Sequence, residues 1–435
     1  MRLILPLLLA VLLLGATDAH AAFKAPCRPG NPGGAKCTYW RAKVNAVDDG
    51  DTLKVHVLGA GNGKERVRVT GMNAPELTHY SHTPSERRGP CHGTEAAAFV
   101  DAALRGTGHM VRLAAQRKSS HSGVRIRRTV WLKKDGVWRD LAQMELRAGL
   151  ALWLPNTVEW AHNRQYEKLA SAAILAKRGI YNPSACAAGP DDDLPISLRV
   201  NWDANGNDDH NLLGEYVDVR NGGDRDLSLT GWFFRDSALR RARNGVYGYP
   251  FPAGATVPAH STVRLRVGCG DNDPSHFFWC QTETVFENVN HRKGSGDGGY
   301  LFDGDGDLRA ARIYPCMLRC VDPPKGKLLL RVHPRPPEAI TIFNRSGEDL
   351  ALADHVLKLN YQGKVDQYVF GRTFPAPSVL GAGDTFTYRP ARKKSIPNHG
   401  GVVELRSDDD ILTACGDWGF GRCGRAPKRR KHRSA

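Results

Sequence analysis

Two aspartates with a glycine between them lie at a strand-like turn near residue 50. The segment from Val47 to Thr52 reads V-D-D-G-D-T, and its second and third carboxylates are Asp49 and Asp51. Carboxylate oxygens at this spacing can both reach one hard cation such as Ca²⁺ or Mg²⁺. Because Asp-Gly is also a common pair in plain hairpin turns, the spacing alone leaves both interpretations open.

A second group of polar side chains follows the next strand-like stretch. Arg68 lies in that stretch, and Glu76 comes eight residues later, directly behind Pro75. Hydrolysis of a phosphodiester needs a cation and guanidinium groups against the phosphate, and a carboxylate that orients or deprotonates water. These residue types therefore indicate phosphodiester hydrolysis, although Arg68 alone would also suit a surface salt bridge.

The elements that must position these side chains can be read from hydrophobic periodicity. Alternation predicts strands, and apolar spacing of three and four predicts helices that end near glycine. The strands are expected at 53–57, 66–70, 109–114 and 124–132, and the helices at 94–104, 139–148 and 159–178. About five strands with three helices indicate an α+β unit in which a small barrel packs against helices.

Residues 39–185 resemble the staphylococcal nuclease (thermonuclease-like) family in the order and spacing of their motifs. The matching segments are residues 47–55, 68–76, 93–97, 125–132, 149–151 and 166–181. The resemblance implies an OB-fold-like five-stranded barrel with three helices. It also implies Ca²⁺-dependent cleavage of DNA and RNA that leaves a 3′-phosphate.

Roles carried over position by position follow from this resemblance. Asp51 would be the main metal ligand with support from Asp49, and Ala74 would offer its backbone carbonyl. Asn73 stands where the family has a second aspartate ligand, so the site loses one formal charge and its affinity or preferred ion should change. The resemblance makes Glu76 the general base or water-orienting carboxylate and Arg68 a phosphate clamp.

The second phosphate clamp of the family follows a Tyr-Gly pair that this chain lacks. The chain reads S-G-V-R up to Arg125, and counting back from the following strand favours Arg125 as the clamp. Arg127 lies on the same strand face and stays the alternative, whereas Arg128 points to the other face. The family stacks the base on tyrosines, and Trp153 is the nearest aromatic residue after Gly149 here.

The C-terminal half shows short strands broken by Gly, Pro, Asn and Asp, which is typical of β-sandwiches. After a linker at 186–195, residues 196–320 resemble a lamin-tail domain, an immunoglobulin-like sandwich, in segments such as 214–217, 229–232, 251–254 and 268–270. Residues 325–420 look like a degenerate second copy. Residues 424–435 form a basic segment that we expect to be disordered.

The N-terminus and the cysteines indicate export. Residues 1–21 have the charged start, apolar run and A-x-A end of a cleaved signal peptide, with an uncleaved anchor as the alternative, and residues 22–38 form a leader. Ten cysteines suit an oxidising compartment, although sequence alone does not fix their connectivity. Pairing of neighbours would join Cys27/Cys37, Cys269/Cys280, Cys316/Cys320 and Cys415/Cys423 and leave Cys91/Cys186. In secreted nuclease relatives a cysteine at the position of Cys91 is often paired with one like Cys186.

Three other groups of residues invite a metal interpretation that we disfavour. His79, His82, Cys91 and His92 could bind zinc, but their loop looks like that of the nuclease family. Asp303, Asp305 and Asp307 mimic the start of a calcium loop, but Tyr314 stands where its bidentate glutamate should be. We interpret both this segment and residues 203–207 (D-A-N-G-N) as solvated turns.

The formal net charge of +16 attracts polyanions. DNA or RNA is the obvious partner, and an anionic cell-surface polymer would be attracted by the same physics. We therefore expect a secreted, metal-dependent nuclease. The alternatives are a barrel that binds nucleic acid or polymer without cutting it, and a cell-surface adhesin built on the C-terminal half.

Overall fold

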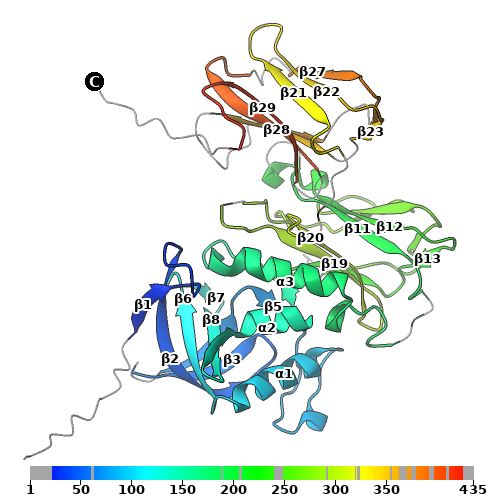
Figure 1. Cartoon of the computed structure of the whole chain (residues 1–435). Helices are drawn as coiled ribbons and strands as arrows, with labels where there is room; N and C mark the ends of the chain where they lie inside the picture. Colours follow the sequence, from blue (N-terminus) through cyan, green and yellow to red (C-terminus); the bar gives the residue numbers. More distant parts are fainter. Residues whose placement is uncertain are drawn as a thin grey trace, which may run out of the picture.

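The chain folds into three consecutive units, coloured from blue to red in Figure 1. The computed structural model describes residues 22–59, 63–187, 189, 191–204, 208–239, 248–290, 292–318, 320, 324–352, 355–361, 370–373, 379–390, 396–407 and 411–424. The predicted signal peptide and nearly all of the predicted basic tail lie outside these residues. No helix among the described residues is long and apolar enough to cross a bilayer.

The first unit is a barrel covered by helices. Its elements are β1 (Phe23–Pro26), β2 (Lys36–Val47), β3 (Thr52–Val57), β4 (Lys64–Val69), β5 (Met72–Asn73), α1 (Gly93–Arg105), β6 (Met110–Ala115), β7 (His121–Ser122), β8 (Arg125–Lys134), β9 (Val137–Asp140), α2 (Leu141–Ala148), β10 (Leu152–Trp153) and α3 (Asn163–Leu175). Strands pair in the order β2-β3-β4-β8-β6, and β6 returns to β2 to close five strands. Only β4 and β8 of this ring run parallel, which gives the strand order of an OB-like barrel.

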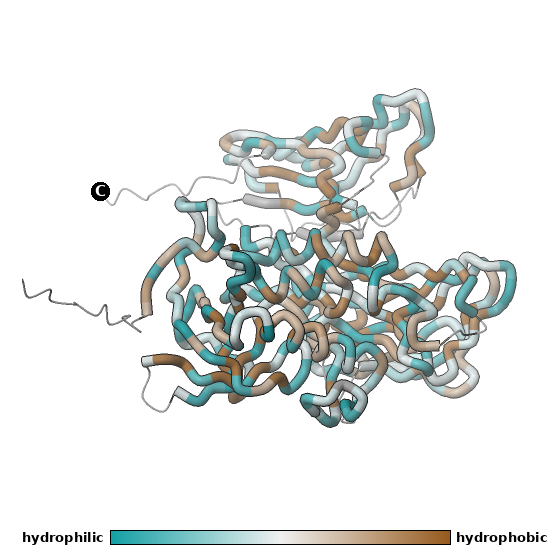
Figure 2. The backbone as a smooth tube through the Cα atoms, turned by 60° about the horizontal axis from the view of Figure 1, so that its bottom comes forward, coloured by the Kyte–Doolittle hydropathy of each residue, from teal (hydrophilic) through white to brown (hydrophobic). Residues whose placement is uncertain are grey.

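Alternation along these strands explains the closure. Val44, Val55 and Val67 are buried, whereas the intervening Lys54 and Arg66 are exposed. Figure 2 shows this alternation as brown and teal segments along the tube. Since one face of every strand is apolar, the sheet buries that face by curling around it and by taking α1 and α2 over its ends.

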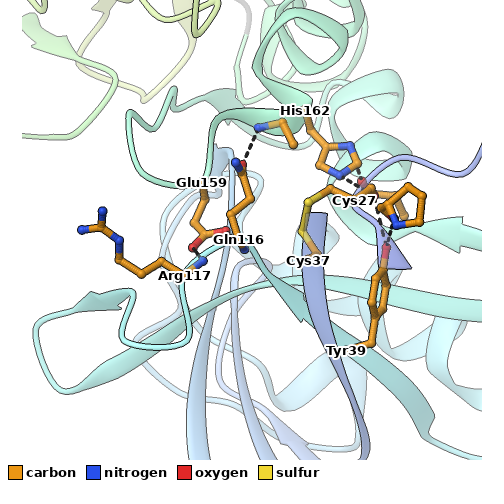
Figure 3. Close-up of a disulfide and its surroundings, with 10 residues drawn as sticks. Cys27, Cys37, Tyr39, Gln116, Arg117, Glu159 and His162 are labelled. Carbon is orange, nitrogen blue, oxygen red and sulfur yellow. Dashed lines mark hydrogen bonds and ion pairs between the residues drawn. A yellow bond between two sulfur atoms is a disulfide. The ribbon is translucent and has the colours of Figure 1, made fainter. Parts of the chain in front are cut away.

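The N-terminal segment differs from the prediction of a leader ahead of a structured domain starting near Tyr39. Strand β1 pairs with β2, with Phe23 opposite Tyr39. The Tyr39 hydroxyl donates to the Pro26 carbonyl at 2.8 Å, and a ring nitrogen of His162 lies 3.1 Å from the Cys27 carbonyl (Figure 3). A disulfide closes this hairpin between Cys27 and Cys37, so the segment is an extra barrel strand.

Two predicted helix starts were wrong, because in each case the chain forms other contacts where the helix was expected to begin. Arg139 belongs to β9, and α2 begins after Asp140, whose carboxylate accepts from the Ala142 amide at 3.0 Å. Glu159 precedes α3, because its carboxylate binds the backbone N–H groups of Gln116 and Arg117 at 2.6 and 3.0 Å (Figure 3). These bonds tie the β6–β7 connection to the chain that enters α3.

The second unit is a β-sandwich. Its strands are β11 (Ile196–Asn201), β12 (Tyr216–Asn221), β13 (Leu227–Ser228), β14 (Phe233–Asp236), β15 (Tyr249–Pro250), β16 (Thr256–Val257), β17 (Thr262–Arg266), β18 (His276–Phe278), β19 (Asp297–Phe302) and β20 (Leu308–Tyr314). One sheet has the order β11-β12-β17-β18 and the other β15-β14-β19-β20, and β13 pairs with β16. Val217, Leu265, Phe234 and Leu301 from the two sheets meet in one core.

The third unit is also built of strands. They are β21 (Leu328–His333), β22 (Ala339–Asn344), β23 (Leu350–Ala351), β24 (Val356–Tyr361), β25 (Phe370–Thr373), β26 (Val379–Leu380), β27 (Thr385–Tyr388), β28 (Gly400–Arg406) and β29 (Leu412–Gly419). Their pairing, β21-β22-β27, β25-β24-β28-β29 and β23-β26, repeats that of the second unit except for β18.

The barrel and the first sandwich share one continuous apolar core. Tyr300, Leu308 and Ile313 of the sandwich belong to the same buried cluster as the barrel strands and helices, and α3 lies along β20 (Figure 1). The ten cysteines form five disulfides: Cys27–Cys37, Cys91–Cys186, Cys269–Cys280, Cys316–Cys320 and Cys415–Cys423. The Cys91–Cys186 bridge fixes the loop before α1 to the chain that leaves the barrel.

Candidate active site

The turn between β2 and β3 holds the two aspartates. The Asp49 carboxylate accepts from the Asp51 amide at 2.9 Å, so this side chain folds the turn as well as carrying charge. Both residues are buried, and Asp51 is only 1% exposed. The sequence forms this turn because a short carboxylate can accept from the backbone two residues on, next to a glycine.

Asp51 is held from three sides. One of its oxygens accepts from the Thr52 hydroxyl and forms an ion pair with Arg68 Nη1, both at 2.9 Å, and the other accepts from the Ala74 amide at 2.9 Å. Burial raises the pKa of Asp51 to about 7, against the opposing positive charge of Arg68. A carboxylate has about four acceptor sites, so these three bonds leave room for a further ligand.

Glu76 lies beside these carboxylates with its side chain exposed to the cavity described below. Burial of part of the side chain and the charge of Asp49 raise the pKa of Glu76, and a hydrogen bond with the Asp49 carboxyl acts in the same direction. Arg68 and Arg125 oppose that increase. A carboxylate with a raised pKa at an accessible position is suited to take a proton from water near neutral pH.

The arginines of β8 separate into two positions. Arg125 Nη1 donates to the Thr52 hydroxyl at 2.8 Å, the hydroxyl that also bonds Asp51, while Arg127 lies opposite Arg68 in the parallel register. Arg125 and Arg127 both line the cavity. Arg128 instead is buried over the Trp40 ring at 4.8 Å and donates to the Lys118 carbonyl, so it is structural.

Asn73 is buried at the end of β5, where the barrel meets the sandwich. Its amide nitrogen donates to the Ser237 carbonyl at 2.9 Å. Because this bond uses the nitrogen, the amide oxygen is the atom of Asn73 that could serve as a ligand. The next residue, Ala74, binds Asp51 through its backbone N–H and leaves its carbonyl for other partners.

A third buried carboxylate lies under the aspartate turn and was missed by the sequence analysis. Glu145 of α2 is fully buried, and neither carboxyl oxygen has a hydrogen-bond partner among the described residues. A Cβ added to Gly50 would lie 2.7 Å from the Ala74 Cβ, 2.9 Å from the Ala96 Cβ and 3.0 Å from Glu145 Oε2, which explains why glycine separates the two aspartates. Burial, with Asp51 and Asp49 adding, raises the pKa of Glu145 well above its usual range.

The helical spacing of α2 held the signal for Glu145. Leu141, Ala142, Glu145 and Leu146 occupy positions i, i+1, i+4 and i+5, which form one helix face, and the other three residues are buried. An acidic residue on an apolar face is rare without a reason. The sequence could therefore have suggested a carboxylate pointing into the barrel.

The site opens into a cavity of about 720 Å³. Its barrel side carries the arginines and Glu76, and its other side belongs to the sandwich. The polar lining from the barrel is Arg68, Thr70, Asn73, Glu76, Ser122, Arg125, Arg127, Asn156 and Thr157. A volume of this size is typical of pockets that enclose a small ligand.

None of the described residues that line this cavity is aromatic. Trp153, the nearest aromatic residue by sequence, is fully buried and pairs with Met72 between β10 and β5, so it belongs to the core. Trp153 therefore offers no exposed ring face on which a base could stack.

The other groups considered for metal binding have structural roles. Cys91 and Cys186 lie near His92 but are joined to each other, so their thiolates are not available. The Asp307 carboxylate accepts from the amides of Cys186 and Ala187 at 2.8 and 3.0 Å, and Asp303 binds amides of its own turn. Asp203 forms an ion pair with Lys358 at 3.2 Å, and Asn205 to Asn207 lie outside the described residues.

The donor types at the aspartate turn suit a hard divalent cation, but the carboxylate oxygens there are not gathered as closely as the ligands of one ion. Among the described residues, the group of three His, Cys, Asp or Glu side chains with ligand atoms within 4.8 Å of one another is Cys91, His92 and Cys186. Asp49, Asp51 and Glu145 offer carboxylate oxygens, and Asn73 and Ala74 offer carbonyl oxygens. The unpartnered oxygens of buried Glu145 are the observation that carries this fit, because a buried carboxyl without partners is costly. A cation of charge two would offset that cost.

The fold combines an OB-like barrel with an immunoglobulin-like sandwich that completes its cavity. Residues 192–315 match the sequence model of the Lamin Tail Domain family, which confirms the lamin-tail resemblance of the segment predicted at 196–320. The matched segment contains the cavity residues Ala238, Leu239, Glu287, Ser295 and Asp297. A search among curated proteins finds no significant match.

Proposed function

We propose that this protein is a secreted, metal-dependent phosphodiesterase that hydrolyses nucleic acid in the barrel cavity. The observation that carries the proposal is the convergence of Asp51, Glu76, Arg68 and Arg125 on one site. The staphylococcal nuclease resemblance of residues 39–185 implies the same groups in the same roles. The net charge of +16 supports a polyanionic substrate.

In this proposal Asp49, Asp51, Asn73, Ala74 and Glu145 hold Ca²⁺, or Mg²⁺ in its place. The bound ion would supply charge neutralisation at the phosphate. Glu145 would restore the negative charge that the site lacks at Asn73. Its position under Gly50 and its charge interactions with Asp51 and Asp49 support that assignment.

The protein's own groups account for the remaining chemistry. Glu76 accepts a proton from the attacking water, whose oxygen forms a bond to phosphorus while the bond to the leaving oxygen breaks. Arg68 and Arg125 stabilise the charge that develops on the phosphoryl oxygens. Arg68 is paired with Asp51 here, so a cation at Asp51 would free the guanidinium for the phosphate.

A barrel that binds nucleic acid without cutting it is the second candidate. The neutral Asn73 and the occupation of Asp51 by Arg68 favour it. Incubation of the full chain with a labelled oligonucleotide, with Ca²⁺ or with a chelator, separates the two candidates. Cutting that disappears with chelator and in Glu76→Gln supports the enzyme, and binding without cutting supports the second candidate.

The third unit supports a proposal of its own. We infer that residues 325–420 are a second, diverged lamin-tail domain. Asn221 and Asn344 end corresponding strands, and each side-chain amide donates to the carbonyl four residues on, at 2.7 and 2.8 Å. Each side-chain amide also donates to a backbone carbonyl on an equivalent strand, Asn221 to Val257 on β16 and Asn344 to Leu380 on β26.

Secretion is also part of the proposal. The five disulfides and the lack of a membrane-crossing helix among the described residues are compatible with an extracellular protein. Detection of the chain in culture medium with its start near residue 22 would support it.

A further inference from the structure

The second wall of the cavity comes from the lamin-tail domain. Opposite the arginines of the barrel lie Ala238, Leu239, Glu287, Ser295 and Asp297. These residues come from the end of β14 and from the start of β19 with the chain before it. The barrel alone would present its phosphate-binding groups on an open face, and the domain turns that face into a cavity.

This wall is fixed to the barrel by contacts on several sides. The two units share a buried apolar cluster, and the Cys91–Cys186 disulfide lies at their junction. Asn73 donates to Ser237, and Asn163 of α3 donates to the Lys293 carbonyl at 3.2 Å. A movement that opened the cavity would have to break these contacts together.

Among the described residues the two walls differ in charge. Arg68, Arg125 and Arg127 lie on the barrel side, whereas exposed Glu287 lies on the lamin-tail side. Asp297 on that side is buried, which raises its pKa to about 7, and Arg235 lies buried beside Asp236 behind it. A phosphate backbone is attracted to the first wall and repelled by the second. Carboxylates can also accept hydrogen bonds from the amino groups of bases, as they do from cytosine.

This arrangement suits one strand and opposes two. A single strand can lay its phosphates on the arginines and turn its base edges to the wall that carries Glu287. A duplex carries one negative charge per about 1.7 Å of its axis, and its second strand would face Glu287. The cavity volume of about 720 Å³ also suits a nucleotide or two, not a double helix.

We propose that the lamin-tail domain acts as the specificity wall of the site: it admits an unpaired strand or strand end and excludes the interior of a duplex. The proposal deepens the proposed function and rests on it for the catalytic part. It assigns the domain a place in substrate selection, beyond attachment or general binding.

Binding tests the wall independently of catalysis. The full chain carrying Glu76→Gln is titrated with a labelled 12-nucleotide strand and with the blunt duplex of the same sequence, in Ca²⁺. We expect the strand to bind at least tenfold more tightly. Equal affinity for strand and duplex would overturn the proposal that the lamin-tail domain selects an unpaired strand, whether or not the native protein cuts nucleic acid.

Two wall variants with matched controls locate the effect. Glu287→Lys should reduce the preference for the strand at least threefold, and Glu283→Lys, exposed four residues away, should leave it unchanged. Ala238→Trp should narrow the cavity and weaken strand binding about tenfold, and Ala253→Trp on another exposed turn of the domain should not. Equal effects in a variant and its control would also overturn the proposal.

Hydrolysis distinguishes this inference from the proposed function. If the native protein cuts none of the three substrates, bis(p-nitrophenyl) phosphate, the strand and the duplex, the proposed function fails. The binding preference for the strand then still tests whether the lamin-tail domain selects the substrate. If strand and duplex are cut at equal rates, the wall fails while the proposed function stands. Cutting of the strand at least tenfold faster than the duplex supports both.

Discussion

The side-chain amide of Asn73 donates a hydrogen bond to the backbone carbonyl of Ser237, 2.9 Å away and 164 residues further along the chain. The first residue stands at a candidate metal position of the barrel, and the second belongs to the lamin-tail domain. A carboxylate at position 73 could not make this bond, because it has no proton to donate to a carbonyl at neutral pH. The neutral residue at this candidate metal position is thus explained by the domain interface.

Asn73→Asp should therefore have two opposite effects. A carboxylate adds charge for the cation, so Ca²⁺ should bind more tightly, but its oxygen faces the Ser237 carbonyl, so the metal-free protein should lose about 1–3 kcal/mol. Calorimetric Ca²⁺ titration and urea unfolding in chelator measure the two effects. Asn163→Asp, which loses a bond to the Lys293 carbonyl, is the control and should lose stability with unchanged Ca²⁺ affinity. Weaker or unchanged Ca²⁺ binding in Asn73→Asp would remove residue 73 from the ligands.

Glu76→Gln and Arg68→Ala should each lower kcat/KM by about 10²-fold or more, as expected for removal of a proton acceptor or a transition-state donor. Native activity should rise with pH through a pKa above the ordinary value of glutamate, because burial and Asp49 hold the proton on Glu76. The rate at which each protein cleaves a labelled strand in Ca²⁺, measured from pH 4 to pH 8, checks both expectations. Near-native rates in both variants would place the active site elsewhere.

The two candidate clamps on β8 can be separated directly. Arg125 donates to the Thr52 hydroxyl beside Asp51, and its positive charge lowers the pKa of Glu76. Neither interaction is found for Arg127. We expect Arg125→Ala to lose about 10²-fold in rate and Arg127→Ala less than tenfold. Single-turnover rates at saturating strand measure the difference, and the reverse order of the two losses would make Arg127 the clamp.

The part of the candidate site that is formed by residues close together in the sequence could be predicted. Asp49, Asp51, Arg68 and Glu76 lie within 28 residues of one another, on or next to strands whose alternation is plain in the sequence. Periodicity therefore gave the barrel and the side of each strand that carries these groups. The failures at Tyr39 and Arg139 arose where a disulfide hairpin and an N-cap set the boundary.

The contacts that complete the site could not be read from the sequence. Glu145 reaches the aspartate turn only because α2 packs beneath it, and Glu287 and Asp297 reach the cavity only through the domain interface. No periodicity within one segment encodes which segment it will pack against. The likeness of the last two units, by contrast, was visible in the sequence, where residues such as Asn221 and Asn344 follow similar strand-like stretches.

Glu145→Met should weaken metal binding and raise the stability of the metal-free protein. A well-packed apolar side chain in place of a buried, unpartnered carboxyl should stabilise the metal-free protein by about 1–3 kcal/mol. Loss of the carboxylate should weaken Ca²⁺ binding at least tenfold. Glu145→Gln, which keeps the shape and a polar group, should lose the affinity without the gain in stability. Urea unfolding in chelator and Ca²⁺ titration test this, and native Ca²⁺ affinity in both variants would show that Glu145 is only structural.

Glu167 of α3 should make the fold less stable as pH rises. Burial raises the pKa of Glu167 to about 7 from an ordinary 4.5, so the folded protein holds this proton more tightly than the unfolded chain does. Its contribution to stability is then complete below about pH 4.5 and is lost as pH rises through about 7. Glu167→Gln, which stays neutral, should gain about 2–3 kcal/mol relative to the native protein between pH 5 and pH 8. Urea midpoints at these two pH values measure the gain, with exposed Glu95→Gln as the control. An equal pH dependence in Glu167→Gln and the native protein would show that Glu167 ionises in the folded state as it does in the unfolded chain.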